Sequence, residues 1–392
     1  MPYSSRCFYV VAVDALALVM SSTLPTSLYS IYKSTFGLNP ILITVIYSVY
    51  PIVVVPSLFF FGPLGDKYGR KPILLVATAI AMVSLLLLGF ANGLTWLIAG
   101  RALQGLALGV AFGNSTAALV EFEPNGNRKR ANVTAGASLF AGLILGPLTA
   151  GVLGKYFPYP LLLPYLVTLI LFSVVFAFLL TIPEEHEKLE NAPLFYKPTI
   201  PTGKSAIFFS SALAAGLVFA MSGLYYSLAP TYVETVLNIN NIAVGGAVVS
   251  LMALVATAVQ FFGTRVEPKP LMIGGQVFLI VGLTLLVFSV LVKSFSVLLA
   301  GAVVSGIGYG AVFHGAVSVI NSIAPKDQRG NVTSSFYAIL YLVLALPTIG
   351  IGFATQESNL SEAFAYFSLA IIAVTVIHLV WLATKGKNEK FS

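Results

Sequence analysis

Charged residues are scarce in this 392-residue sequence: Asp, Glu, Lys and Arg make up only 9% of it, whereas 58% is hydrophobic. Soluble domains carry about 25% charged residues, so the composition excludes an ordinary soluble globular protein, and it is the reverse of what disorder requires. Cysteine is almost absent, with Cys7 as the only one. A single cysteine excludes a disulfide framework and any zinc or iron–sulfur site built from cysteines. The composition is typical of a polytopic membrane protein.

Long apolar runs fill most of the chain. A helix needs about 20 mostly apolar residues to cross the hydrocarbon, and with that window we find twelve stretches. The first contains Asp14 and is too long for a signal peptide, so we expect it to be a span. The fold class is therefore an all-α membrane protein with twelve transmembrane helices. They are expected near residues 8–31, 41–62, 72–91, 95–119, 132–155, 161–182, 204–228, 242–264, 271–292, 296–320, 332–354 and 363–383.

The distribution of Lys and Arg predicts the orientation. With the N-terminus inside, nearly all of the 21 basic residues fall in inner loops and tails. The outer loops hold only Lys33, Lys155 and Lys293, and Arg101 alone lies within a span. We therefore expect a multi-pass plasma-membrane protein with both termini in the cytoplasm. The net charge of +7 then faces the anionic inner leaflet, so no nucleic-acid partner is expected.

The sequence also predicts two six-helix halves. A polar stretch at 183–203 separates an N-terminal bundle, 1–182, from a C-terminal bundle with a short tail, 204–392. Five short patterns recur about 200 residues apart, which indicates an internal repeat. Parallel repeats of this kind place a binding site near the middle of the membrane between the halves. The recurring pairs are 130–134 with 329–333, 60–62 with 261–263, 71–72 with 269–270, and in the fourth and tenth spans 99–100 with 300–301 and the glycines at 105 and 109 with those at 306 and 310.

The loop after the second span carries the most specific motif, Gly62-Pro-Leu-Gly-Asp-Lys-Tyr-Gly-Arg-Lys-Pro72. Its glycines allow two helix ends to approach closely, and Arg70 can pair with an acid opposite. This loop resembles the signature loop of the major facilitator superfamily. The resemblance implies a cytoplasmic gate that opens and closes as the halves move. We assign to it Gly62, Gly65, Asp66, Gly69 and Arg70, with Glu121 or Glu123 as the acid that pairs with Arg70.

Two further patterns refine the resemblance. Residues 101–105, Arg-Ala-Leu-Gln-Gly, resemble the intramembrane arginine motif of the superfamily, which is often linked to proton coupling. Residues 142–151 resemble the antiporter motif of twelve-helix drug:proton exporters, through Gly142, Gly146, Pro147 and Gly151, although Ala150 stands where that family usually has glycine. Glycines four residues apart permit close helix contact, and a proline within a span kinks the helix. Ordinary helix packing is the alternative explanation.

Charged residues within spans point to proton coupling. A charge in hydrocarbon costs at least about 2.5–3.5 kcal/mol, so Asp14 and Arg101 each need a reason. We assign Asp14 as the proton carrier and Arg101 as a residue that tunes the coupling. Alternatively, Asp14 is a paired structural acid and Arg101 extends its charge to the outer interface.

The first, fourth, seventh and tenth spans line the cavity in this superfamily, which gives a set of candidate substrate contacts. Aromatic side chains with few charges suit a large amphipathic compound, including a cation held against ring faces. Packing seams and interfacial belts are the alternative role for the tyrosines. The candidates are Ser21, Ser22, Gln104, Asn114, Met221, Tyr225, Tyr226, Tyr309 and His314, which Tyr47, Tyr50, Tyr337 and Tyr341 could join.

These patterns together predict a transporter that works by alternating access, most simply a proton-coupled exporter of small amphipathic or drug-like compounds. A proton symporter or uniporter for a sugar, carboxylate or other metabolite is the alternative. An enzyme is not expected, because the spans contain no cluster of nucleophile, base or metal ligands. We expect no metal or other cofactor, a proton gradient as driving force, and a monomer whose partners are substrate, protons and lipid.

Overall fold

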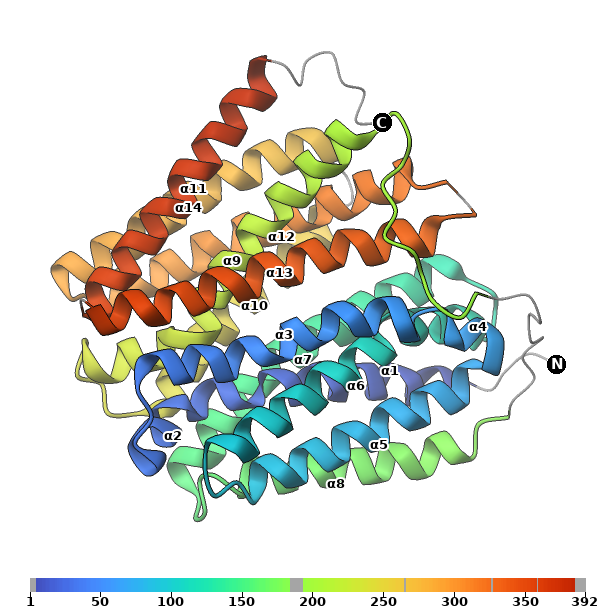
Figure 1. Cartoon of the computed structure of the whole chain (residues 1–392), viewed down its shortest axis with the longest axis horizontal. Helices are drawn as coiled ribbons and strands as arrows, with labels where there is room; N and C mark the ends of the chain where they lie inside the picture. Colours follow the sequence, from blue (N-terminus) through green and yellow to red (C-terminus); the bar gives the residue numbers. More distant parts are fainter. Residues whose placement is uncertain (1–4, 184–192, 264–265, 326, 358, 385–392) are drawn as a thin grey trace. The chain divides into compact units, whose positions relative to one another are not determined.

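The computed structural model describes residues 5–183, 193–263, 266–325, 327–357 and 359–384 (Figure 1). Residues 184–192 of the predicted linker lie outside this part. Everything regular in the described residues is helical. The elements are α1 (Ser5–Thr23), the 3-10 turn η1 (Leu24–Leu28), α2 (Tyr29–Phe36), α3 (Pro40–Phe61), α4 (Leu64–Tyr68), α5 (Arg70–Gly89), α6 (Leu94–Glu121), α7 (Arg128–Tyr156), α8 (Leu163–Leu180), α9 (Ser205–Thr235), α10 (Ile242–Gly263), α11 (Pro268–Val292), α12 (Phe295–Ile323), α13 (Arg329–Glu357) and α14 (Leu360–Thr384).

Twelve segments of the described chain are long and apolar enough to cross a membrane, which confirms the predicted number of spans. Each coincides with one of the stretches predicted from hydropathy. The first, Ser5–Phe36, is interrupted, because α1 passes through the 3-10 turn η1 into α2. Pro25 lies in that turn, and its missing N–H explains why the α-helical hydrogen bonding breaks there.

The chain forms two compact units, residues 1–37 with 49–197, and residues 38–48 with 198–392. We call them unit 1 and unit 2. The change from one to the other after Lys197 falls within the predicted linker. Residues 38–48, which open α3, belong to unit 2, where the Ser48 hydroxyl donates to the carbonyl of Ala345 over 3.1 Å.

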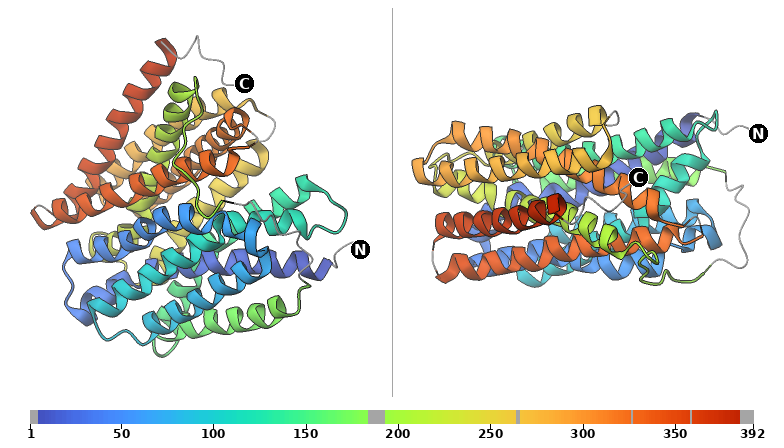
Figure 2. Two further views of the ribbon diagram at one scale, coloured as in Figure 1. Left: turned by 45° about the vertical axis from the view of Figure 1, so that its right-hand side comes forward. Right: turned by 90° about the horizontal axis from the view of Figure 1, so that it is seen from above.

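The same helix pairs form the core of each unit. In unit 1, α1 packs on α6, α7 and α8, and α5 packs on α6 and α8. In unit 2, α9 packs on α12, α13 and α14, and α11 packs on α12 and α14. Within each unit the helices run side by side in every view (Figure 2). The matching pairs agree with the internal repeat expected from the sequence.

Repeated glycines make one of these matching contacts. A Cβ on Gly105 of α6 would overlap the carbonyl oxygen of Tyr50 on α3. A Cβ on Gly306 of α12 would lie 2.6 Å from the carbonyl oxygen of Met252 on α10. One helical turn further along, a Cβ on Gly109 would overlap the side chain of Ser57 on α3, and one on Gly310 would overlap the carbonyl oxygen of Ala256 on α10. Because apolar surfaces gain little from association in lipid, such close backbone packing is what holds membrane helices together.

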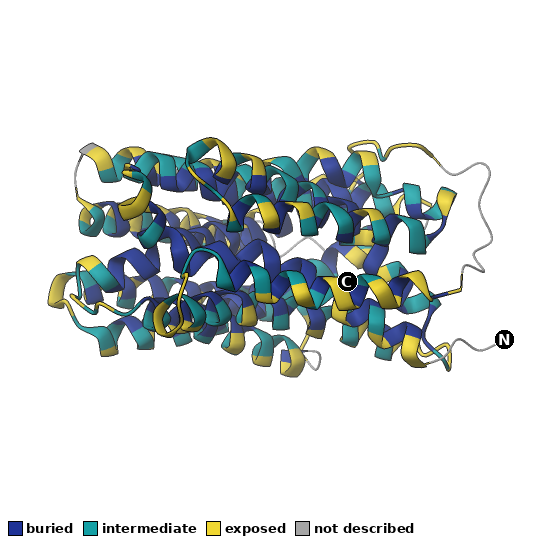
Figure 3. Ribbon diagram, turned by 90° about the horizontal axis from the view of Figure 1, so that it is seen from below, coloured by how far each residue is buried: buried dark blue, intermediate teal, exposed yellow. Residues whose placement is uncertain are grey.

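Burial distinguishes central from peripheral helices. The most apolar window of α9 is 89% buried, whereas those of α8 and α14 are only 33% buried. Large apolar side chains such as Ile170 of α8 and Ile377 of α14 are exposed, as expected for lipid-facing positions. Figure 3 shows exposed residues on the outward sides of the helices and buried ones between them. Polar side chains in the middle of α1 and α9, such as Asp14 and Ser211, lie inside their units.

Candidate functional site

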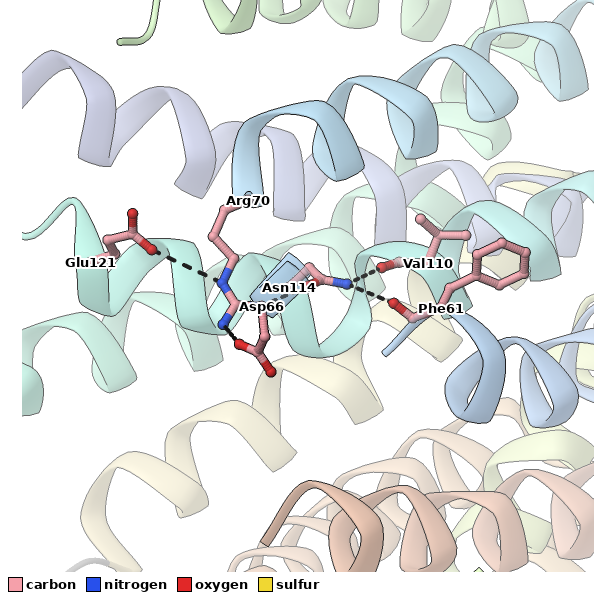
Figure 4. Close-up of polar contacts among 6 residues, drawn as sticks. All are labelled: Phe61, Asp66, Arg70, Val110, Asn114 and Glu121. Carbon is pink, nitrogen blue, oxygen red and sulfur yellow. Dashed lines mark hydrogen bonds and ion pairs between the residues drawn. The ribbon is translucent and has the colours of Figure 1, made fainter. Parts of the chain in front are cut away.

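The signature loop folds into the short helix α4 and a sharp turn into α5. Gly69 ends α4 with a φ of 98°, a backbone conformation that residues other than glycine rarely adopt. Its N–H donates to the carbonyl of Gly65 over 3.1 Å. The turn places Arg70, the first residue of α5, so that its guanidinium donates to the carboxylate of Asp66 (Figure 4).

Arg70 also reaches α6. Its Nη1 donates to the side-chain oxygen of Asn114 over 2.9 Å, and its Nε lies 4.0 Å from a carboxylate oxygen of Glu121 (Figure 4). Asp66, Arg70, Asn114 and Glu121 are the signature-loop cluster below. Its charges are partly shielded, with 12% of the Arg70 side chain exposed against 31% for Asp66. Of the two acids proposed to face Arg70, Glu121 is the one that lies opposite it.

Asn114 therefore has a different place from the one predicted. We expected it to line a substrate cavity, but its side-chain amide donates to the carbonyls of Val110, over 2.8 Å, and of Phe61 at the end of α3, over 3.3 Å, while its oxygen accepts from Arg70. The residue is fully buried. Its amide thus ties α3, α5 and α6 together beneath the signature loop, because a buried amide needs partners for its donors and its acceptor.

Gly62 and Gly65, the two other glycines of the loop, lie so close to neighbouring atoms that a larger side chain would not fit. A Cβ on Gly65 would overlap the side chains of Asn114 and Arg70. A Cβ on Gly62 would lie 2.7 Å from the ring of Tyr196, whose N–H donates to the carbonyl of Phe59 over 2.8 Å. Burial raises the pKa of Tyr196, with a smaller contribution from the charge of Asp66. The sequence analysis missed Tyr196, because a single tyrosine in a polar linker carries no periodic signal.

Glu123 serves a separate cluster. One of its oxygens accepts from the backbone N–H groups of Asn125 and Asn127, over 2.8 and 2.6 Å, and the other pairs with Arg130 at 2.9 Å. The hydrogen bond from Asn127 is the main reason that the pKa of Glu123 lies below its ordinary value. Arg130 also donates to the hydroxyl of Tyr9 over 3.0 Å. Glu123 therefore stabilises the turn between α6 and α7 and does not face Arg70, because its oxygens are taken by the turn that follows it.

Asp14 lies inside unit 1, on the side of α1 that faces α5. It is fully buried, and one carboxylate oxygen accepts from the hydroxyl of Thr78 over 2.8 Å. The other oxygen has no hydrogen-bond partner among the described residues. A buried carboxylate with an unpartnered oxygen is expensive when charged, so the surroundings favour a protonated carboxyl group.

Arg101 binds the break in the first span. Its Nη1 donates to the carbonyl of Ser22 and to the side-chain oxygen of Gln104, both over 2.6 Å, and its guanidinium lies 4.2 Å from the centroid of the Tyr50 ring. Gln104 in turn donates to the carbonyl of Ser21 over 2.7 Å. Pro25 has no N–H with which to satisfy that carbonyl, so Gln104 replaces a helical hydrogen bond.

These contacts place Arg101 apart from Asp14, with partners of its own. The arginine is only 1% exposed and its charge is balanced by carbonyl dipoles and a ring face. Among the predicted cavity residues, Ser21 and Ser22 turn their hydroxyls back to their own helix, at Leu18 and Val19. The arrangement is that of a buried capping site for the end of α1.

The residues of the antiporter-like motif form the contact between α7 and α1. A Cβ on Gly142 would lie 2.6 Å from the carbonyl oxygen of Leu16, and one on Gly146 would lie 2.7 Å from that of Met20. Pro147 and Gly151 are buried in the same helix. The glycines thus allow α7 to lie directly on the backbone of α1, as the spacing predicted.

Two hydroxyls of the first span bind the α7 backbone at this contact. Thr23 donates to the carbonyl of Gly142 over 3.2 Å, and Ser27 of η1 donates to the carbonyl of Pro147 over 2.7 Å. The matching contact in unit 2 is that between α9 and α13. There the glycines lie on α9, the equivalent of α1, where Gly216 and Gly223 face α13. The matching contact is therefore built differently in the two units.

The predicted cavity residues of unit 2 lie in its interior. Met221 and Tyr225 are fully buried, Tyr226 is 5% exposed, and His314 is half-buried. Tyr309 belongs to a group of aromatic rings, only some of which were candidates in the sequence analysis. That Tyr309 and the other candidates contact substrate stays a prediction.

That group joins three helices. Phe219 of α9 stacks on Tyr309 at 6.0 Å and meets Phe313, also of α12, at 5.7 Å and Tyr341 of α13 at 5.9 Å between ring centroids. Tyr337 lies 6.4 Å from Phe313. The spacing of four residues from 309 to 313 and from 337 to 341 puts each pair on one helix face, which is the signal that could have found Phe313. In the described residues, no three His, Cys, Asp or Glu side chains stand together in a way that could hold a metal ion.

Comparison with known proteins identifies the family of the chain. The chain is 26% identical to the "Tetracycline resistance protein, class H" of Pasteurella multocida over 57% of this chain, and it spans about half of that relative, 52%. It is 24% identical to the "Multidrug resistance protein MdtL" of Shigella flexneri serotype 5b (strain 8401) over 83% of this chain and 84% of that protein. Among solved structures, the peptide transporter POT in complex with sulfate matches with a TM-score of 0.81 and 13% identity, covering 97% of this chain and 95% of that one.

The family model of the Major Facilitator Superfamily matches residues 13–268 and 260–392, which is nearly the whole chain. Twelve spans, the repeated helix pairs and the geometry of the signature loop agree with that match. The chain is a multi-pass membrane protein and belongs to the Major Facilitator Superfamily.

Proposed function

We propose that this protein is a proton-coupled exporter of small amphipathic or drug-like compounds that works by alternating access. The observation that carries the proposal is Asp14: a fully buried acid with one oxygen held by Thr78 and the other without a hydrogen-bond partner in the part of the chain that the structure describes. A carboxyl group in this setting is stable with its proton and costly without it. Proton binding and release at Asp14 therefore change the energy of unit 1, which is what coupling to a proton gradient requires.

Arg101 acts in this proposal on the helix that carries Asp14. Its bond to the carbonyl of Ser22 and the bond of Gln104 to that of Ser21 fix the end of α1 where η1 interrupts the span. A change of packing around Asp14 is then transmitted along α1 to this end. Arg101 is accordingly a positioning residue.

The signature-loop cluster would act as the cytoplasmic gate. Its ion pairs join α4, α5 and α6 within unit 1 and leave Asp66 about one-third exposed, at 31%. An exposed carboxylate beside a fixed arginine can exchange one cationic or helix-terminal partner for another. Ligands that favour one opening then shift the population of conformations, with protons and substrate favouring different states.

The substrate class is supported by the relatives. Relatives named for tetracycline resistance and multidrug resistance align with 57% and 83% of this chain, although the former aligns over only 52% of its own length. The buried rings around Phe219 provide apolar, polarisable surface and no fixed charge of their own. Such surfaces suit amphipathic compounds better than sugars, which need many polar partners.

The test is substrate-induced proton movement in proteoliposomes. Panels of lipophilic cations, tetracycline-type compounds, sugars and carboxylates are added to the wild type and to Asp14→Asn, with Thr78→Val as the variant that keeps the acid but removes its donor. We expect compounds of the first two classes to move protons in the opposite direction, Asp14→Asn to abolish this movement, and Thr78→Val to retain it with a changed pH profile.

Each alternative gives a distinct result. Protons that move with a sugar or carboxylate would replace export by symport. Transport with no proton movement would indicate a uniporter. Coupled transport that persists in Asp14→Asn would assign the proton to another residue and leave the exporter proposal in place.

A further inference from the structure

Unit 2 contains a buried titratable network that the sequence analysis did not identify. His378 of α14 is 4% exposed and lies between two polar side chains. Its Nδ1 is 2.7 Å from the side-chain oxygen of Gln276 on α11, and its Nε2 is 2.9 Å from the hydroxyl of Ser210 on α9. Three helices of unit 2 therefore meet at one imidazole.

The hydrogen bonds define how the neutral ring is protonated. The amide nitrogen of Gln276 donates to the carbonyl of Met272 over 3.3 Å, so its oxygen faces the ring and must accept. Nδ1 then carries the hydrogen, and Nε2 accepts from Ser210. Every polar group of the neutral network is satisfied, as burial requires.

The same network can also hold a second proton on the ring. With both nitrogens protonated, Nε2 would donate to the oxygen of Ser210, and the serine hydroxyl would turn to a carbonyl of its own helix. Ser222 and Thr235 already make this turn in α9, donating to Phe219 and Thr231 over 2.7 and 2.8 Å. Uptake of a proton thus requires the rotation of one hydroxyl and the breakage of no other contact.

The network in unit 2 shares one position with the site of Asp14 in unit 1, although Asp14 lies on the first helix of its unit and His378 on the last. In the register set by Lys71-Pro72 and Lys269-Pro270, Thr78 of α5 corresponds to Gln276 of α11. Thr78 binds Asp14 where α1 packs on α5 and α8, and Gln276 binds His378 where α9, α11 and α14 pack together. In each unit, the corresponding residue of the third span therefore binds a buried titratable group.

From this placement we propose that His378 is a second proton-binding residue of the chain, bound by Gln276 in unit 2 as Asp14 is bound by Thr78 in unit 1. Proton binding neutralises the acid of unit 1 and charges the imidazole of unit 2, so the two sites respond to protons with opposite changes of charge. The pH dependence of transport then has two components. This last step rests on the proposed proton-coupled export, whereas proton binding at His378 does not.

The charged groups on the helices around His378 stand toward their ends. They are Glu362 near the start of α14 itself, Lys269 at the start of α11, Glu234 near the end of α9, and Arg329 and Glu357 at the two ends of α13. The remaining titratable groups on these helices are tyrosines of α9, α13 and α14: Tyr225, Tyr226, Tyr232, Tyr337, Tyr341 and Tyr366. The groups that bind the imidazole in the described structure are the neutral Ser210 and Gln276.

Trp381 provides a direct reporter of this protonation. It lies one turn after His378, with ring centroids 6.1 Å apart and planes inclined by 12°. The chain has only two tryptophans, so Trp96→Phe leaves Trp381 alone. A protonated imidazole in contact with an indole quenches its fluorescence, and a neutral one does so much less.

The experiment uses the purified full chain carrying Trp96→Phe, with emission recorded between pH 8 and pH 4 and elution profiles checked across that range. We expect acidification to quench the fluorescence reversibly, and His378→Gln to remove this quenching. The control is His314→Gln, which changes the half-buried histidine of α12 and should retain the quenching. Gln276→Glu should move the midpoint upward by about one pH unit or more, because a carboxylate beside the ring favours its charged form. Emission that does not titrate in the folded protein, or that titrates equally in His378→Gln, would overturn the proposal.

Transport assays distinguish proton binding at His378 from an effect of that proton on transport. In proteoliposomes, His378→Gln should retain export and change its pH profile relative to the wild type, in the pH range where the fluorescence of Trp381 titrates. An unchanged profile with intact fluorescence titration would overturn the link to transport and keep the proton site. A wild type that moves no protons would contradict the proposed function, yet the fluorescence titration would still decide the assignment of His378.

Discussion

Replacement of Gly146 by alanine tests the contact between α7 and α1 on which the antiporter-like motif depends. The added Cβ would lie 2.7 Å from the carbonyl oxygen of Met20 and 3.1 Å from the N–H nitrogen of Leu24, and it would overlap the hydroxyl of Thr23. Ordinary contacts of a Cβ begin at 3.4 Å. The two helices must therefore separate by several tenths of an ångström, or α7 must rotate.

Two opposing terms set the magnitude. Overpacking of a well-packed contact costs typically about 1–3 kcal/mol, whereas alanine gains about 1 kcal/mol over glycine in a helix interior. Gly136, also in α7, provides a matched control because no atom lies within 4 Å of its Cβ position. Since the helical gain is common to both variants, Gly146→Ala should be less stable than Gly136→Ala by about 1–3 kcal/mol.

The assay is thermal unfolding of the purified variants in detergent, followed by transport in proteoliposomes. Gly146→Ala should have a lower midpoint than the wild type and reduced transport, and Gly136→Ala should equal or exceed the wild type in both. Addition of Thr23→Ala to Gly146→Ala should restore only part of the loss, because the carbonyl of Met20 is backbone and stays in place. Equal midpoints for the two glycine variants would refute the close contact between α7 and α1.

Three further variants test other contacts of unit 1. Gly65→Ala should reduce transport at least about tenfold, because its Cβ would displace the side chains at Arg70, while Gly113→Ala, which has open space at its Cβ, should not. Gln104→Leu leaves a buried carbonyl at the end of α1 without its donor and should lower the free energy of unfolding by about 1–3 kcal/mol, measured by denaturation in detergent. The pKa of Glu123 is lowered in the folded chain, so its contribution to stability is present above its ordinary pKa of 4.5 and is lost as the pH falls through the lower, folded value. Glu123→Gln should therefore flatten the fall of the thermal midpoint below about pH 4.5.

The spans could be predicted because their signal is local. Hydrocarbon demands about 20 apolar residues in a row, and each of the twelve predicted stretches became a helix. The break at η1 was equally local, since Pro25 is visible in the sequence, but its consequence depended on residues elsewhere. The donors that bind the carbonyls of Ser21 and Ser22 come from α6, about 80 residues later, and no pattern in the first span announces them.

The residues of the site could be predicted where a sequence motif determines a turn. They were harder to predict where a polar side chain can bind several different partners. The glycines of the signature loop and the pairing of Arg70 followed from the motif. Asn114 was assigned to a cavity because a polar residue inside a span can equally face a ligand or another helix, and only the tertiary packing places it on Arg70. His378 was missed for the same reason, since its two partners lie on helices distant in the sequence.

The contacts of α1 give it a distinct mechanical position within unit 1. Polar bonds connect it to three of the helices it packs on: Asp14 to α5, its terminal carbonyls to Arg101 and Gln104 of α6, and Thr23 to α7. Because apolar packing alone gains little in lipid, these bonds rather than surface burial determine how α1 is held. A proton on Asp14 alters one of them directly and the others only through the helix. Variants of Arg101 or Gln104 should therefore change the coupling between proton and substrate more than they change the binding of either.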